Sequence, residues 1–139
     1  MTDLFPDIEV GEMLTSGEVL SFEAEAQITK GSPVYLTADM KVSPSPGGDN
    51  AIGVAVSSAE AGKPCSVCTR GAVKVTANGS IARGAAVCSA ASGKVTQLVD
   101  QAVDEAGSAT YTIYYARKLG IALQAPSTDG DTFLIHVEK

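Results

Sequence analysis

Two matching stretches decide the fold: Ala24-Glu25-Ala26-Gln27-Ile28-Thr29-Lys30-Gly31-Ser32-Pro33-Val34 and Ala77-Asn78-Gly79-Ser80-Ile81-Ala82-Arg83-Gly84-Ala85-Ala86-Val87. The offset between them is constant, because 81 − 28, 84 − 31 and 87 − 34 all equal 53. Each stretch places an apolar residue, a cation, a glycine and a valine in the same order. Glycine accepts a positive φ without a Cβ clash, so we expect a strand that ends in a tight turn at Gly31 and again at Gly84.

The similarity continues on both sides of these stretches. Residues 20–28 alternate apolar and polar side chains, and residues 73–81 do the same, which is typical of half-buried strands. Further matches are Lys41-Val42 with Lys94-Val95 at offset 53, then Ile52-Gly53-Val54-Ala55 with Leu119-Gly120-Ile121-Ala122 at offset 67. The second copy therefore carries 67 − 53 = 14 extra residues.

We interpret the chain as two tandem copies of one β unit, about 20–71 and 72–139, within a single β domain of residues 18–139. The fold class we predict is all-β, a compact barrel or sandwich, preceded by an N-terminal arm of residues 1–17. The extra residues form an insertion at about 97–118. Its apolar side chains are spaced for one face of a short helix, with a glycine as a stop: Leu98, Val99, Ala102, Val103, Ala106 and Gly107.

Composition limits the partners. The net charge of −6 and the pI of about 4.6 disfavour nucleic acid, which needs a clustered basic surface. We expect no membrane segment, because no apolar run approaches the roughly 20 residues that cross a bilayer. Three cysteines cannot all pair within one chain, which favours synthesis in a reducing cytoplasm.

The sequence contains no recognised catalytic or metal-binding pattern. His136 lies in an alternating segment near the chain end, without a recognisable nucleophile or base beside it. Cys65 and Cys68 form a CxxC, but only Cys88 and His136 remain to complete a zinc site, at no recognised spacing. We therefore interpret the cysteines as buried and inert, and we expect no enzyme, no cofactor and no bound metal.

Two groups of apolar and aromatic residues are candidates for contact with a partner. In the arm, Leu4, Phe5 and Ile8 stand among acidic residues. They indicate either a frayed terminus or an arm that docks on a neighbouring subunit. A second group, in the insertion, combines large area with a polar tip, so it is either a contact surface or a cross-strand aromatic patch: Tyr111, Tyr114 and Tyr115.

Taken together, the motifs resemble those of the small capsid decoration, or cement, proteins of tailed bacteriophages and related head-tailed viruses. The resemblance covers residues 20–137. It lies in four motifs that follow one another along the first copy and recur in part in the second: Ile28-Thr29-Lys30-Gly31-Ser32-Pro33-Val34-Tyr35, Ile52-Gly53-Val54-Ala55, Ala61-Gly62-Lys63-Pro64 and Gly71. The inserted residues 97–118 depart from a regular second copy.

The resemblance implies a non-enzymatic structural protein of the virion. Such a protein is made in the host cytoplasm and binds the major capsid protein on the outer face of the shell. It bridges coat subunits where capsomers meet, often as a trimer. In this reading the arm adds a strand to a coat-protein sheet edge, with Leu4, Phe5 and Ile8 as its anchors.

Two alternatives stay open. One is a non-catalytic β module that binds a carbohydrate or acts as a carrier. Lys41 and Lys94, at matched places in the two copies, would be the carrier lysines. The absence of Trp leaves only the tyrosines of 111–115 to stack on a sugar. The other alternative is a β domain of a phage tail or baseplate.

Overall fold

The structure of the protein is a computed structural model, which describes residues 2–99, 101–105, 108–112 and 117–139. Over these residues the chain forms β-strands and the 3-10 turn η1 (Ala91–Gly93). The strands are β1 (Glu18–Ala24), β2 (Pro33–Ala38), β3 (Lys41–Pro44), β4 (Ala51–Ala55), β5 (Pro64–Thr76), β6 (Ala86–Ser89), β7 (Val95–Gln97), β8 (Gln101–Glu105), β9 (Ser108–Thr112), β10 (Gly120–Ala122) and β11 (Thr132–Glu138).

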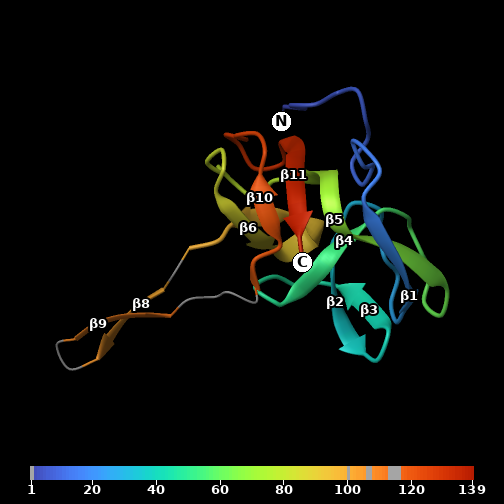
Figure 1. Ribbon diagram of the computed structural model, residues 1–139, viewed down its shortest axis with the longest axis horizontal. Coiled ribbons are helices and arrows are strands. Elements are labelled where there is room, and N and C mark those ends of the chain that lie inside the picture. The colour runs from blue at the N-terminus through green and yellow to red at the C-terminus, as the bar shows by residue number, and fades with distance from the viewer. Residues whose placement is uncertain (1, 100, 106–107, 113–116) are drawn as a thin grey trace.

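Five strands close into a barrel. They pair in the order β1-β3-β2-β4-β5, and β1 also pairs with β5, which completes the ring. Closure leaves no open sheet edge around the ring, apart from stretches where a strand outruns its neighbour. The prediction of an all-β barrel is thus confirmed, and Figure 1 shows these strands grouped on one side of the molecule.

The long strand β5 belongs to both halves of the molecule. Its first half pairs with β1 and β4, and its second half pairs with β11, from which the sheet continues through β10 and β6 to β7. We call β1 to β4 with the start of β5 the first half of the molecule, and the end of β5 with β6, β7, β10 and β11 the second half. Cys65 lies in the hydrophobic core of the first half of the molecule, and Cys68 lies in that of the second half. β5 therefore joins two hydrophobic cores through one continuous backbone.

The insertion forms strands where the sequence was compatible with a helix. β8 and β9 pair antiparallel over five residue pairs and make a separate two-stranded sheet. In Figure 1 this hairpin extends away from the nine-stranded sheet. The helical interpretation of residues 98–106 was therefore wrong. A helix of two turns is marginal by itself, whereas a hairpin pairs its backbone groups across the two strands, and Thr110 and Thr112 favour a strand.

The first strand of each copy is shorter than its alternating pattern predicted. The pattern continues to Ile28 and Ile81, but β1 ends at Ala24 and β5 ends at Thr76. Ile28 still enters the barrel core, and Ile81 is buried in the second core. The period-2 pattern therefore identified the buried side chains beyond the ladder but not the end of the ladder.

Backbone hydrogen bonds recur at matched positions in the two halves. The Gly31 amide donates to the Ala55 carbonyl at 2.8 Å, and the Gly84 amide donates to the Ala122 carbonyl at 2.8 Å. Three further amide-to-carbonyl bonds of the first half each have a match in the second half. They are Ser45 to Pro33, matched by Leu98 to Ala86; Glu25 to Val42, matched by Asn78 to Val95; and Gly62 to Ala24, matched by Gly130 to Ala77. These matches support the two-copy interpretation, which stays a prediction.

Candidate functional site

The N-terminal residues 2–14, called the strap below, lie along the protein's own second half. The amides of Gly11 and Leu14 donate to the carbonyls of Lys74 and Ala72 on the outer edge of β5, at 2.8 and 3.0 Å. The Lys74 amide donates back to Glu12 at 3.1 Å. Near its start, the strap continues onto β11, where the Leu4 amide donates to the Thr132 carbonyl at 2.9 Å. The strap is thus held along an intramolecular strand edge by backbone hydrogen bonds, with isolated bridges at Asp3 and Met13.

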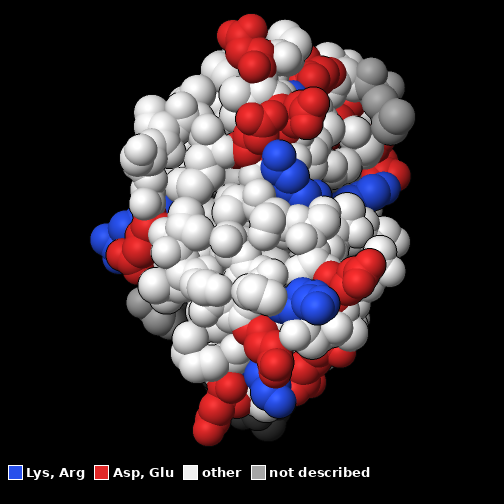
Figure 2. Space-filling model, turned by 90° about the vertical axis from the view of Figure 1, so that its right-hand side faces the viewer, with Lys and Arg blue, Asp and Glu red and all other residues white. Residues whose placement is uncertain are grey.

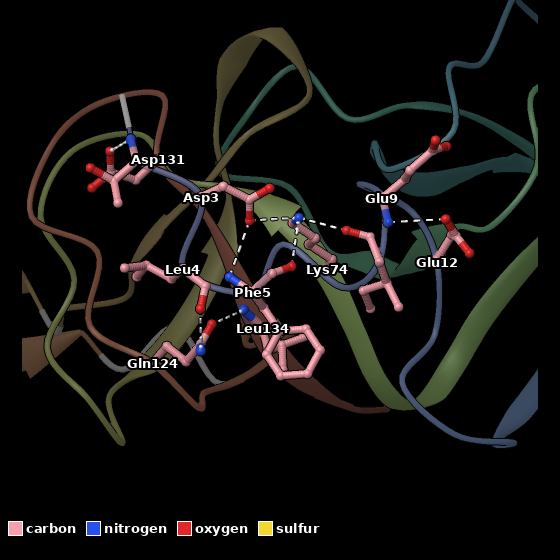
Figure 3. A network of polar contacts seen from close by, with 11 residues as sticks. Asp3, Leu4, Phe5, Glu9, Glu12, Lys74, Gln124, Asp131 and Leu134 are labelled. Atoms are coloured by element: carbon pink, nitrogen blue, oxygen red, sulfur yellow. Dashed lines mark hydrogen bonds and ion pairs between the residues drawn. The ribbon is translucent and has the colours of Figure 1, made fainter.

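A buried lysine holds the strap in place. The side chain of Lys74 is 2% exposed, and its ammonium forms an ion pair of 2.6 Å with Asp3. It also donates to the carbonyl oxygens of Phe5 and Ile8 at 2.8 and 2.6 Å. All three acceptors belong to the strap, and Figure 3 shows them converging on the ammonium. A buried cation requires such partners, so this lysine and the strap stabilise each other.

Two carboxylates fix the start of the strap. Asp131 is buried and accepts the Thr2 amide at 2.7 Å, and the hydrogen bonds from Thr2 and then from the Ser127 and Thr128 amides lower the pKa of Asp131. The hydrogen bond from Lys74 is the main cause that lowers the pKa of Asp3. Both groups are therefore held in their charged form, in which they accept hydrogen bonds best.

The candidate anchors of the arm lie within the strap. Leu4 is half-buried and packs against the second core, and the Gln124 side chain donates to its carbonyl at 3.0 Å. Phe5 and Ile8 are half-buried as well. The structure therefore brings the three residues together on the protein's own surface, where their backbones serve Lys74.

The tyrosine group lies in the insertion. Tyr111 belongs to β9, where it pairs with Ala102 of β8. Tyr114 and Tyr115 lie outside the described residues. The contact surface proposed for the three tyrosines stays a prediction.

Both turn glycines have a positive φ, 94° at Gly31 and 81° at Gly84. Their surroundings differ. A Cβ atom at Gly84 would meet nothing within 4 Å, whereas one at Gly31 would collide with the Val10 side chain of the strap. The strap therefore also reaches the turn of the first half.

The cysteines and the histidine lie in settings unlike those of a reactive site. Cys65, Cys68 and Cys88 are buried and unpaired, and burial raises the pKa of each thiol above its ordinary value, which suppresses the reactive thiolate. His136 lies 3.3 Å from Glu138 on a half-exposed face. Among the residues that the structure describes, no three side chains of His, Cys, Asp or Glu are grouped to hold a metal ion.

The matched lysines are held in ion pairs. Lys41 lies 3.3 Å from Glu23, and Lys94 lies 3.0 Å from Asp129. A hollow of about 510 Å³ separates the turn at residues 27–32 from Thr76 and Gly93, and Lys30 is the charged residue of its lining. Neither feature groups side chains into a site for one particular small molecule.

The face that carries β1 is notable for its lack of charge. Figure 2 views the molecule from the side on which β1 lies in Figure 1 and shows a broad area without Lys, Arg, Asp or Glu, with charged side chains around it. Val19 and Leu20 of β1 are exposed, and so is Met40 at the turn between β2 and β3. None of the described helical residues forms a segment long and apolar enough to cross a membrane.

The closed barrel, the strap and the uncharged face define a small all-β protein suited to contact with another macromolecule. Residues 14–137 match the model of the phage cement protein family, and the chain belongs to this family. It is therefore a structural protein of the virion that associates with the capsid.

A solved structure supports the fold. The crystal structure of the head fiber gp8.5 N base in bacteriophage phi29 is similar with a TM-score of 0.59 and 14% sequence identity, over 87% of this chain and 93% of that chain. At this identity the likeness concerns the fold alone. A search of curated proteins found no match.

Proposed function

We propose that the protein binds the outer surface of the phage capsid and stabilises the shell by bridging adjacent coat subunits, in a role without catalysis. The observation that carries this proposal is the match to the phage cement family over residues 14–137. The partner is the major capsid protein, and synthesis takes place in the host cytoplasm, in keeping with the three free cysteines.

The fold suits a bridging mechanism. A barrel that shares β5 with a second core transmits force through one backbone, so two coat subunits bound to it cannot separate without breaking one of its interfaces. The uncharged area of Figure 2 offers a surface with little charge to desolvate. Because capsomers meet at threefold and quasi-threefold positions, we propose that the protein acts there as a trimer.

The arm residues stay part of the proposal in a modified form. Leu4 packs against the protein's own core, so the buried side of its side chain can contact the coat only if the start of the strap leaves β11. Phe5 and Ile8 are half-buried and can contribute their exposed sides to a coat contact while the strap stays bound. We therefore expect Phe5 and Ile8 to contribute more to capsid binding than Leu4.

Co-sedimentation with undecorated shells tests the function. The purified protein is mixed with expanded shells of its virus and, in parallel, with unexpanded precursor shells. We expect saturable binding to expanded shells, with a ratio at saturation that identifies the symmetry position. Absence of binding to both kinds of shell would overturn the proposal.

A further inference from the structure

The outer edge of β1 has the same construction as the β5 edge that the strap covers. Ser21 lies opposite Ser66 of β5, as Lys74 lies opposite Leu134 of β11. In both pairs the residue on the partner strand directs its backbone carbonyl away from the edge strand. The Ser66 carbonyl accepts the Val56 amide, and the Leu134 carbonyl accepts the Leu123 amide. The backbone groups of Ser21 therefore point outward, like those of Lys74.

Only the β5 edge is occupied. The Lys74 amide and carbonyl both bind the strap. At the matched position Ser21 has no such backbone partner on its outer side within the part of the chain that the structure describes. The difference is clear in the neighbouring side chains, because Val73 is 0% exposed and its counterpart Leu20 is 45% exposed.

A hollow adjoins the free edge. It has a volume of about 350 Å³, and its lining is formed by Ser21, Phe22, Glu23, Met40, Gly62 and Pro64. Pro64 of β5 pairs with Glu23 as Thr132 of β11 pairs with Thr76. At Thr132 the strap residues Thr2 and Leu4 are bound through backbone hydrogen bonds. The hollow therefore occupies, beside Pro64 in the first half, the position that strap residues 2–4 occupy beside Thr132 in the second half.

We propose that the edge of β1 at residues 19–21, together with this hollow, binds an extended segment of the coat protein by strand addition, through backbone hydrogen bonds like those that hold the strap on β5. The proposal rests on the proposed function for the identity of the partner. The protein's own strap is already engaged through Asp3 and Lys74, so the occupant belongs to another chain. A strand added here would cover Leu20 and give Ser21 its missing backbone partners.

The residues beside the hollow limit which coat-protein segment can bind there. Asp131, which accepts the Thr2 amide, follows the turn before β11, and the exposed cation Lys63 lies at the matching place before β5. Lys63 cannot accept an amide as Asp131 does, and the charged residue that lines the hollow is Glu23, which is ion-paired with Lys41. Pro64 lacks the N–H that Thr132 donates to Thr2. The segment we infer is extended and apolar opposite Leu20, without a backbone hydrogen bond to Pro64 of the kind that Thr2 receives from Thr132.

The test compares two edge variants with a matched control in the shell-binding assay. Leu20→Lys places a charge on the edge, and Ser21→Pro removes the outward N–H without removing a bond to β5. Leu123→Lys is the control, because Leu123 is 43% exposed and lies away from this edge. We expect both edge variants to bind expanded shells about tenfold more weakly or worse, and the control to bind like the wild type.

Hydrogen exchange on the wild-type protein supplies a second readout that needs no variant. We expect the Ser21 amide to exchange more slowly on shells than in solution, while the Glu23 amide, already bonded to Met40, serves as the reference. Wild-type binding with an unchanged Ser21 amide and full binding by both edge variants would overturn this inference and leave the proposed function standing. Absence of wild-type binding would instead overturn the proposed function.

Discussion

β1 and the second half of β5 meet their partner strands in the same register, but the strap lies on β5 alone. Val73 and Leu20 occupy matched positions, and Val73 is buried whereas Leu20 is exposed. Lys74 and Ser21 differ in the same way, one buried and ion-paired and the other exposed. The comparison shows that side chains on such an edge are buried where the strap covers the strand, as on β5, and stay exposed where no segment covers it, as on β1.

The largest expected effect tests what the two halves share. A Cβ atom at Gly53 would collide with the carbonyl oxygen of Cys68, and one at Gly120 would collide with that of His136. Because each collision is with the backbone of a paired strand, the chain has to shift. We expect Gly53→Ala and Gly120→Ala each to lower the free energy of unfolding by about 3 kcal/mol.

Urea denaturation of the two glycine variants gives the measurement. Gly79→Ala is a suitable control, since its Cβ would meet nothing within 4 Å, although its φ of 88° adds a backbone cost. If Gly53→Ala is harmless and Gly120→Ala is not, the two halves do not share the close strand contact that the structure gives them.

The next effect tests what the two halves do not share. Lys74→Ser gives the second half the residue that the first half carries as Ser21. The variant leaves the carbonyls of Phe5 and Ile8 without their donor, and we expect a loss of about 2 kcal/mol in the free energy of unfolding. The reciprocal change, Ser21→Lys, lies on an exposed site, where we expect a change within about 0.5 kcal/mol.

Limited proteolysis of the lysine variant follows the strap directly. We expect cleavage within residues 2–14 to become much faster in Lys74→Ser than in the wild type, because the strap loses its central anchor. Equal cleavage rates would mean that the backbone bonds to β5 hold the strap without the ammonium.

The sequence could predict those features of the structure whose interacting residues are close together in the chain, and it failed where the partners are distant. The glycine and valine spacing placed Gly31 and Gly84 in turns, because a turn depends on neighbouring residues. Alternation assigned Lys74 to the outer face of its strand and Leu20 to the core. In the structure Lys74 is buried and Leu20 is exposed.

The site was missed for a physical reason. Lys74 is buried by three acceptors from residues 3–8, and two of them are backbone carbonyls, which any residue type supplies. The third acceptor, the Asp3 carboxylate, is one of several acidic groups in the arm, so the sequence did not single it out as the partner of Lys74. The apolar residues of the strap indicated a docking segment, without showing that it docks on its own chain.

A smaller effect separates the two turn glycines. Gly31→Ala and Gly84→Ala both force a non-glycine residue to a positive φ, at a cost of about 1 kcal/mol. Only at Gly31 does the new Cβ also displace Val10 of the strap. We therefore expect Gly31→Ala to be the more destabilising of the two in thermal denaturation.

The same pair of variants in a background with Val10→Gly shows whether the strap causes the difference. Removing the Val10 side chain removes the collision, so the costs at Gly31 and Gly84 should converge. A difference that persists would have a cause other than the Val10 side chain, and the nearest candidate is the Gly11 backbone amide of the strap, which would lie 3.3 Å from the new Cβ.

The smallest expected effect is the pH dependence of the strap. The pKa values of Asp3 and Asp131 are lowered in the folded protein, so both carboxylates contribute stability that is complete above their ordinary pKa of about 3.9 and is lost as the pH falls through the lowered values. In the first half Lys63 stands at the place of Asp131, and no strap residue corresponding to Asp3 lies on the described part of β1, so this half lacks the counterparts of the two carboxylates.

Hydrogen exchange as a function of pH measures this difference. After correction for the intrinsic pH dependence of exchange, we expect the amides of Leu4 and Gly11 to lose protection below pH of about 4, before the Gly31 amide of the first half does. Asp131→Asn keeps the shape of the side chain but removes its titration, so the strap of this variant should be less protected at neutral pH and respond less to acid. If acid opens the Gly31 and Gly11 amides together in the wild type, the strap does not open separately and the acid transition belongs to the whole barrel.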